Sequence, residues 1–201
     1  MSINLRPYEA SNLISNDINS ILDLGCRDKL LKNYINDDIK YTGVDFEASE
    51  DVISYNLENG IPCNDNSYEC VLALDVLEHL ENIHYMIEEM KRVSKKEIII
   101  ALPNLYYYRF RFKYLFGYSL GAKYDLPLNK ILDRHRWLTS YNNSKYFIEN
   151  SFAEYNVSIS FAKTSKIKII DIFDRILQKV FPNLASHTVL FYIDLRKYNE
   201  K

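Results

Sequence analysis

The sequence has little of what builds disulfide-stabilised or membrane-spanning proteins. Its 201 residues include only three cysteines, five glycines and five prolines. Cys26, Cys63 and Cys70 are odd in number and lack CxxC spacing, which argues against a disulfide framework and a zinc site. No stretch approaches the roughly twenty apolar residues of a membrane span. Residues 1–19 lack the pattern of a signal peptide, so we expect a cytoplasmic protein.

The chain also lacks an excess of either charge. It carries 25 Lys and Arg against 27 Asp and Glu, a net charge of -2, which gives no general attraction to nucleic acid. Nucleic acid is therefore not an expected partner. Hydrophobic residues make up 47% and charged residues 26% of the sequence, which is ordinary for a globular protein. A chain of this length favours a single domain over residues 1–201.

The most informative stretch runs from Ser20 to Asp28. An apolar segment of strand length ends at Gly25, and residues 30–35 follow with apolar side chains at helical spacing. A second apolar strand ends in Asp45, about twenty residues beyond the turn, where nucleotide-binding folds place a carboxylate against ribose hydroxyls. The pair predicts a domain that binds a nucleoside cofactor. A nicotinamide cofactor is not favoured, because the Gly-x-Gly-x-x-Gly run is absent.

Strand and helix patterns alternate along the rest of the chain. Further strands are predicted at 52–57, 70–74, 97–102, 156–162 and 188–193, and helices at 81–93, from Thr139 or Ser140 to Phe152, and at 169–180. This alternation predicts an α/β fold with a doubly wound, seven-stranded sheet that is mostly parallel and has an antiparallel edge. An aromatic and basic insertion at 105–138 and a helical one at 165–187 interrupt the pattern.

Several short motifs carry a family resemblance. They are Asp23-Leu24-Gly25-Cys26, Val76-Leu77-Glu78-His79-Leu80, Pro103-Asn104 and His135-Arg136-Trp137-Leu138-Thr139. In this order and spacing the sequence resembles the class I S-adenosylmethionine-dependent methyltransferases, in their type 11 and MetW-like branch. The resemblance implies a Rossmann-like sheet with strand order 3-2-1-4-5-7-6, S-adenosylmethionine as cofactor and methyl transfer as activity.

The resemblance also implies which residues bind the cofactor. They are Asp23, Gly25, Cys26, Asp45, Phe46, Asn56, Leu57, Leu74, Asp75 and Val76. Arg27 and Lys29 stand where the family usually has glycine, and in left-handed backbone each would cost about 1–2 kcal/mol. This departure keeps a second interpretation open, in which the protein is a non-catalytic, methyltransferase-like partner or regulatory subunit of another enzyme.

Two histidines are candidate catalytic residues. His135 could serve as a general base, because imidazole titrates near neutral pH. His79 belongs to the Glu-His pair that the resemblance places at the site. Asp75, Glu78 and His79 carry metal-ligand atoms at helical spacing, but they lack a further ligand, so no metal is predicted.

The acceptor is expected to meet the aromatic and basic insertion. The candidate substrate-binding residues are Tyr107, Arg109, Arg111, Arg136 and Trp137, and the acceptor is predicted to be a small molecule, a glycan or a lipid-linked intermediate that is methylated at oxygen. Residues 105–118 also suit peripheral contact with an anionic membrane, or a helical cap over the sheet. The apolar stripe at 169–180 predicts internal packing or a homodimer face.

Overall fold

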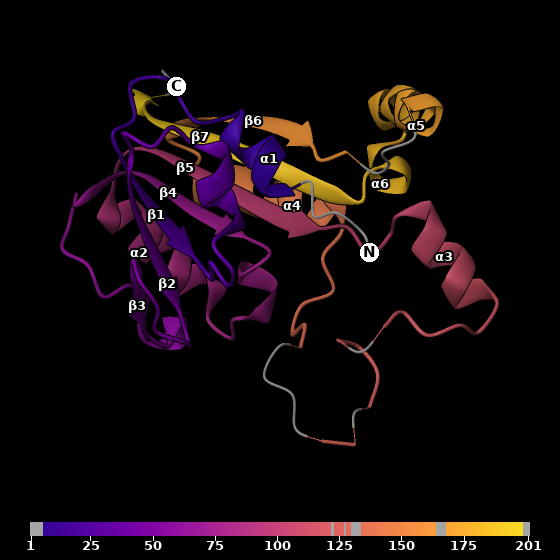
Figure 1. Cartoon of the computed structure of the whole chain (residues 1–201). Helices are drawn as coiled ribbons and strands as arrows, with labels where there is room; N and C mark the ends of the chain where they lie inside the picture. Colours follow the sequence, from indigo (N-terminus) through magenta and orange to yellow (C-terminus); the bar gives the residue numbers. More distant parts are fainter. Residues whose placement is uncertain (1–5, 122, 127, 130–133, 164–167, 199–201) are drawn as a thin grey trace.

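The computed structural model describes residues 6–198 apart from 122, 127, 130–133 and 164–167 (Figure 1). The strands are β1 (Ser20–Leu24), β2 (Lys40–Asp45), β3 (Val52–Ser54), β4 (Tyr68–Leu74), β5 (Ser94–Pro103), β6 (Tyr155–Phe161) and β7 (Thr188–Tyr198). The α-helices are α1 (Arg6–Ser11), α2 (Ile83–Val93), α3 (Tyr108–Leu115), α4 (Tyr141–Ser151), α5 (Lys168–Val180) and α6 (Pro182–Ala185). Three short 3₁₀ helices are η1 (Leu30–Tyr34), η2 (Leu57–Asn59) and η3 (Leu77–His79).

All seven strands form one sheet in the order β3-β2-β1-β4-β5-β7-β6, which confirms the predicted fold. β1 to β5 are mutually parallel. β7 runs antiparallel to both β5 and β6, so the antiparallel strand lies next to the edge strand β6. Because both faces of the sheet are covered, central strands are apolar along their length, as in β4, where Cys70, Val71, Leu72 and Ala73 are all buried.

Each face of the sheet has its own apolar core. α2 and α4 cover one face, to which they contribute Met86, Met90 and Ile148. α1 and η1 cover the other face with Ala10 and Leu31.

Two predicted elements are shorter or tighter than expected. Residues 30–35 form only the 3₁₀ helix η1, because Lys29 before it is left-handed (φ 55°) and five residues are too few to sustain an α-helix. The strand predicted at 52–57 ends at Ser54. The side chain of Asn56 accepts a hydrogen bond from the backbone N of Glu58 (3.0 Å), and this contact starts η2 instead.

The apolar stripe of α5 packs against the protein only in part, because Ile170 and Leu177 are partly buried. The prediction of internal packing is wrong for the rest of the stripe that the structure describes. Ile172, Phe173, Ile176 and Val180 are exposed, whereas Asp174 of the same helix is fully buried. Figure 1 shows α5 and α6 beyond the end of the sheet, with α3 extending away from the same end. Among the described residues, no helix has the length and apolar character needed to cross a membrane.

β1 carries a buried carboxylate. Asp23 is 4% exposed, and the hydroxyl of Tyr41 donates a hydrogen bond to its Oδ2 at 2.8 Å. Burial raises the pKa of Asp23 to about 7, and the negative charge of Asp45 raises it too, whereas the bond from Tyr41 acts in the opposite direction. The folded protein therefore holds a proton that the unfolded chain releases.

This proton makes stability depend on pH. The unfolded carboxyl loses its proton above about pH 4, while the folded one keeps it up to about pH 7. We expect the contribution of Asp23 to the free energy of unfolding to fall as pH rises through that window and to level off above it. Urea denaturation across the window should show a smaller decrease for Asp23→Asn than for the parent protein. The same pH dependence in both proteins would contradict the assignment.

Candidate functional site

The candidate site lies where the parallel strands β1, β2 and β4 end. In a doubly wound sheet a ligand crevice forms at the carboxyl ends of the strands, where the strand order reverses, which here is between β1 and β4. Two adjoining pockets lie there, with volumes of about 650 and 90 Å³. They share Gly25, Arg27, Asp28 and Asp75, so one extended ligand could enter both.

The turn after β1 follows a backbone path that normally requires glycine. Gly25, Arg27 and Lys29 have φ angles of 64°, 46° and 55°. A Cβ on Gly25 would lie 2.6 Å from Cγ2 of Val76, so this position needs glycine for space as well as conformation. Arg27 and Lys29 adopt the left-handed region at a cost of about 1–2 kcal/mol each.

The two basic side chains of this turn do not close the pockets. Nζ of Lys29 donates a hydrogen bond to the backbone O of Glu50 (2.8 Å), and Lys29 lines neither pocket. Arg27 lines both pockets but leaves their volume open. Arg27 and Lys29 in place of glycine therefore add positive charge to the turn, while its backbone path is retained.

Asp45 ends β2 and faces this turn. Its Oδ2 accepts a hydrogen bond from the backbone N of Arg27 (2.8 Å), and its Oδ1 accepts one from the backbone N of Phe46 (2.7 Å). The turn thereby fixes the carboxylate, and each oxygen retains capacity for another hydrogen bond. Because Asp45 lines the larger pocket, it can accept hydrogen bonds from the two hydroxyls of a ribose.

The larger pocket has an apolar wall. It is lined by Phe46, Tyr55, Leu57, Val76 and Leu80. The ring of Phe46 is 60% exposed, so it can stack on a flat heterocycle. An apolar wall beside an oriented carboxylate fits a nucleoside. Asn56, by contrast, lines neither pocket and caps η2 as described above.

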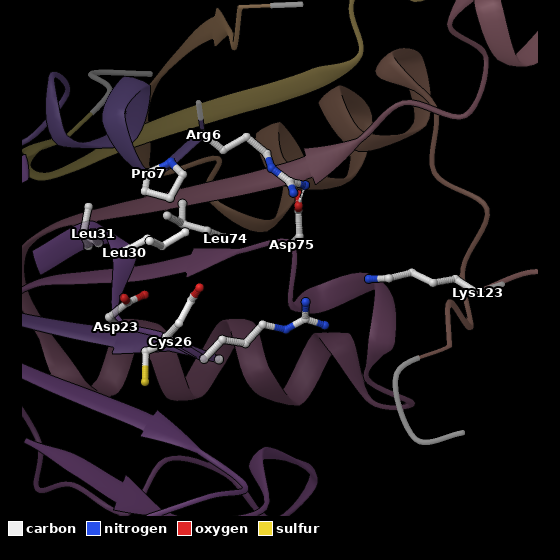
Figure 2. Close-up of a pocket in the computed structure, with 12 residues that line it drawn as sticks. Arg6, Pro7, Asp23, Cys26, Leu30, Leu31, Leu74, Asp75 and Lys123 are labelled. Atoms are coloured by element: carbon white, nitrogen blue, oxygen red, sulfur yellow. Dashed lines mark ion pairs between the residues drawn. The ribbon is translucent and has the colours of Figure 1, made fainter. Parts of the chain in front are cut away.

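The smaller pocket is polar, and an ion pair crosses it (Figure 2). Arg6 reaches from α1 to the carboxylate of Asp75, which follows β4. Oδ1 of Asp75 is buried and has no hydrogen-bond partner among the described residues, so it can accept a hydrogen bond from a ligand ammonium group. Asp23, Cys26 and Leu74 line the same pocket. Burial raises the pKa of the Cys26 thiol to about 12, which argues against a nucleophilic role.

A cluster of three side chains adjoins the larger pocket. His79 lines that pocket, and Nε2 of His79 and Nε2 of His135 lie 3.7 and 3.9 Å from Oε1 of the buried Glu78. Nδ1 of His79 lies 3.0 Å from the backbone O of Arg134, and Nδ1 of His135 lies 2.8 Å from the hydroxyl of Tyr124. The fold thus brings the two predicted catalytic histidines together around one carboxylate.

Arg136 and Trp137 fasten the segment that carries His135. Nε of Arg136 donates a hydrogen bond to the backbone O of His79 (2.8 Å), and Nε1 of Trp137 donates one to the backbone O of Leu80 (2.7 Å). Neither residue lines either of the two pockets described above. These bonds give them a role in positioning His135, and their part in substrate binding stays a prediction.

The other candidate acceptor residues lie away from both pockets. Tyr107 is 2% exposed, and its hydroxyl lies 3.4 Å from Oδ2 of Asp174 in α5. The guanidinium of Arg109 lies over the ring of Tyr107, and that of Arg111 over the ring of Tyr106. None of these residues lines either of the two pockets, so contact with an acceptor there stays a prediction.

Three residues of the site carried no signal in the sequence. Arg6 and Lys123 line the smaller pocket, and Tyr124 contacts His135. Arg6 belongs to a polar segment before the first strand, and the other two belong to an insertion without a predicted element. Both Arg6 and Lys123 are basic residues outside the sheet, but nothing in the sequence distinguishes them from the other basic residues of the chain.

The three-residue cluster also has the chemistry to hold a divalent cation. One ligand atom from each of Glu78, His79 and His135 lies within 4.8 Å of the others, and carboxylate and imidazole groups are common metal ligands. Nζ of Lys123 lies 3.4 Å from Nε2 of His79, and this positive charge works against a cation on that side. The absence of a metal requirement stays a prediction.

The sequence matches known proteins over different lengths. The model of the family described as methionine biosynthesis protein MetW matches residues 9–193. Ubiquinone biosynthesis O-methyltransferase from two strains of Rickettsia bellii is 33% identical over 129 residues, a match that covers 55% of this chain and 52% of each relative. The chain therefore spans about half the length of the curated relatives that it matches.

Solved structures share the fold over nearly the whole chain. A SAM dependent methyltransferase from Archaeoglobus fulgidus has a TM-score of 0.55 at 16% identity, and the match covers 94% of this chain and 90% of that one. A SAM dependent methyltransferase from Aquifex aeolicus has a TM-score of 0.55 at 13% identity and coverages of 94% and 89%. At these identities the likeness establishes the Rossmann-like methyltransferase fold. Since the family model spans β1 to β6, the first part of β7 and all of the site described above except Arg6, the chain belongs to the MetW family.

Proposed function

We propose that the protein is an S-adenosylmethionine-dependent methyltransferase that acts on an oxygen of a small-molecule, glycan or lipid-linked acceptor. The larger pocket carries the proposal, because it joins the ribose-type carboxylate of Asp45 to the polar cluster at His79. Two solved structures of the same fold are titled SAM dependent methyltransferases. The curated relative is named as an O-methyltransferase, which favours an oxygen acceptor. A cytoplasmic location completes the proposal.

The two pockets fit the two ends of this cofactor. Asp45 would hold the ribose hydroxyls, and the ring of Phe46 would stack on the adenine. Oδ1 of Asp75 would accept a hydrogen bond from the ammonium group of the methionine part, whose carboxylate would lie near Arg6 and Arg27. When bound, the cofactor supplies a methyl group on a positively charged sulfur.

The acceptor would approach from the side of His79. An imidazole nitrogen of the cluster would accept the proton of the acceptor hydroxyl as its oxygen takes up the methyl group. Oε1 of Glu78 lies within 4 Å of Nε2 of both histidines, so it can stabilise the imidazolium that would form. Much of the rate would come from holding the acceptor oxygen close to the methyl carbon.

The backbone of the turn weighs against the non-catalytic interpretation. Arg27 and Lys29 were the reason to consider it, because glycine is usual at both positions. Both residues keep positive φ angles, and the larger pocket beside them retains about 650 Å³. Strained backbone of this kind is typical of ligand-binding sites, so it favours a protein that still binds its ligand.

Removing the carboxylate of Asp45 tests cofactor binding. We expect Asp45→Ala to weaken the affinity for S-adenosylmethionine about 10- to 100-fold, because hydrogen bonds to a charged group are lost. Isothermal titration calorimetry measures this directly. Asp38→Ala is the control, since Asp38 is exposed and lines neither pocket. Absence of binding by the parent protein up to millimolar ligand would overturn the proposal.

Removing the imidazole of His135 tests the proton acceptor. We expect His135→Ala to lower turnover about 100-fold and to leave cofactor affinity unchanged, because His135 lines neither pocket. Turnover can be followed as label transferred from methyl-labelled cofactor to acceptors in a cell extract. His84→Ala is the control, because His84 is exposed and lines neither pocket. Unchanged turnover across neutral pH would remove His135 as the base.

A further inference from the structure

α5 has the opposite orientation to an ordinary surface helix, with polar side chains buried and apolar side chains exposed. Its buried side chains are polar, with Asp174 fully buried and Gln178 6% exposed. Most of its described apolar side chains face outward: Ile172, Phe173, Ile176 and Val180, followed by Phe181, are between 49% and 65% exposed, whereas Ile170 and Leu177 are partly buried. A surface helix normally buries its apolar stripe against its own protein. The outward stripe therefore has the character of a binding surface.

Polar contacts hold α5 in this orientation. Nε2 of Gln178 donates a hydrogen bond to the backbone O of Ala185 in α6 (3.4 Å). Tyr107 is the residue directly before α3. Its hydroxyl lies 3.4 Å from Oδ2 of Asp174. The same side chains that turn the apolar stripe outward also join α5 to the start of α3.

α3 is exposed along most of its surface, and only Tyr108 and Phe110 are partly buried. It buries none of its eight residues, and Figure 1 shows it extending away from the sheet. Phe112, Tyr114 and Leu115 are 56%, 77% and 73% exposed, and Phe116 and Tyr118 after them are 67% and 69% exposed. Isolated helices shorter than about 12 residues are marginal in water. α3 is therefore expected to gain order from whatever it binds.

The positive charge of α3 indicates the chemistry of its binding partner. Residues 105–119 contain Arg109, Arg111 and Lys113 and no acidic residue, although the whole chain has a net charge of -2. Arg175 and Lys179 are exposed on α5. Exposed aliphatic and aromatic side chains beside basic ones are the chemistry of a surface that rests on anionic lipid, with tyrosines suited to the boundary between lipid and water.

We propose that the exposed faces of α3 and α5 form one surface that binds an anionic lipid bilayer. The apolar side chains of α5 and the aromatic ones of α3 enter the headgroup region, and Arg111 and Lys113 attract the negative lipid charge. A second copy of the chain fits less well, because a two-fold contact through α3 would oppose its bases to one another. The surface does not involve either pocket, so the inference is independent of the proposed function.

Vesicle sedimentation tests this surface. The parent protein should sediment with vesicles of phosphatidylcholine and phosphatidylglycerol and not with phosphatidylcholine alone, and binding should weaken as salt rises. We expect Arg111→Gln with Lys113→Gln to weaken binding about 30-fold, at about 1 kcal/mol for each charge. Phe173→Ser with Ile176→Ser should also reduce binding at least tenfold.

Matched controls come from α4, outside this surface. Lys145→Gln and Tyr146→Ser remove a partly exposed base and an exposed ring there and should bind vesicles like the parent protein. Thermal unfolding of each variant shows whether it is folded. The proposal would be overturned if the α3 and α5 variants bound vesicles as well as the parent protein does. It would also be overturned if the parent protein sedimented with neither vesicle. Light scattering that shows a dimer of the parent protein and a monomer of the Phe173→Ser, Ile176→Ser variant would assign the surface to self-association and also overturn it.

Discussion

The site depends on the hydrogen bonds that Asp45 makes to its surroundings. Its carboxylate accepts one from the backbone N of Arg27 in the turn after β1 and one from the backbone N of Phe46 after β2. The first bond connects the ends of two neighbouring parallel strands, and both together fix the carboxylate at the pocket. The shape of the larger pocket follows, because Gly25, Asp45 and Phe46 all line it.

This arrangement carries a conformational cost that the rest of the fold offsets. Arg27, Lys29 and Asp75 all have positive φ without being glycine. Three such residues at the ends of β1 and β4 together cost a few kcal/mol, and strain of this kind is common at ligand-binding sites. The apolar cores on the two faces of the sheet supply the stability that holds these residues in place.

The sequence was most informative where local pattern determines structure. Apolar runs located the strands, and Gly25 with Asp45 located the pocket, because strand ends and turn residues are local features. It was less informative about orientation. The stripe of α5 identified an amphipathic helix, but periodicity cannot tell which face meets the protein; the buried Asp174 and its contact with Tyr107 decide that. Arg6 escaped notice because its partner, Asp75, lies far along the chain.

A crystal structure with S-adenosylhomocysteine, the demethylated product of the cofactor, tests the central claim most directly. The account predicts ribose hydroxyls within hydrogen-bond distance of the Asp45 carboxylate, with the adenine against the ring of Phe46 and the amino acid end beside Asp75. A nucleoside bound elsewhere, or a space between Asp45 and Phe46 filled by the side chain of Arg27, would contradict it.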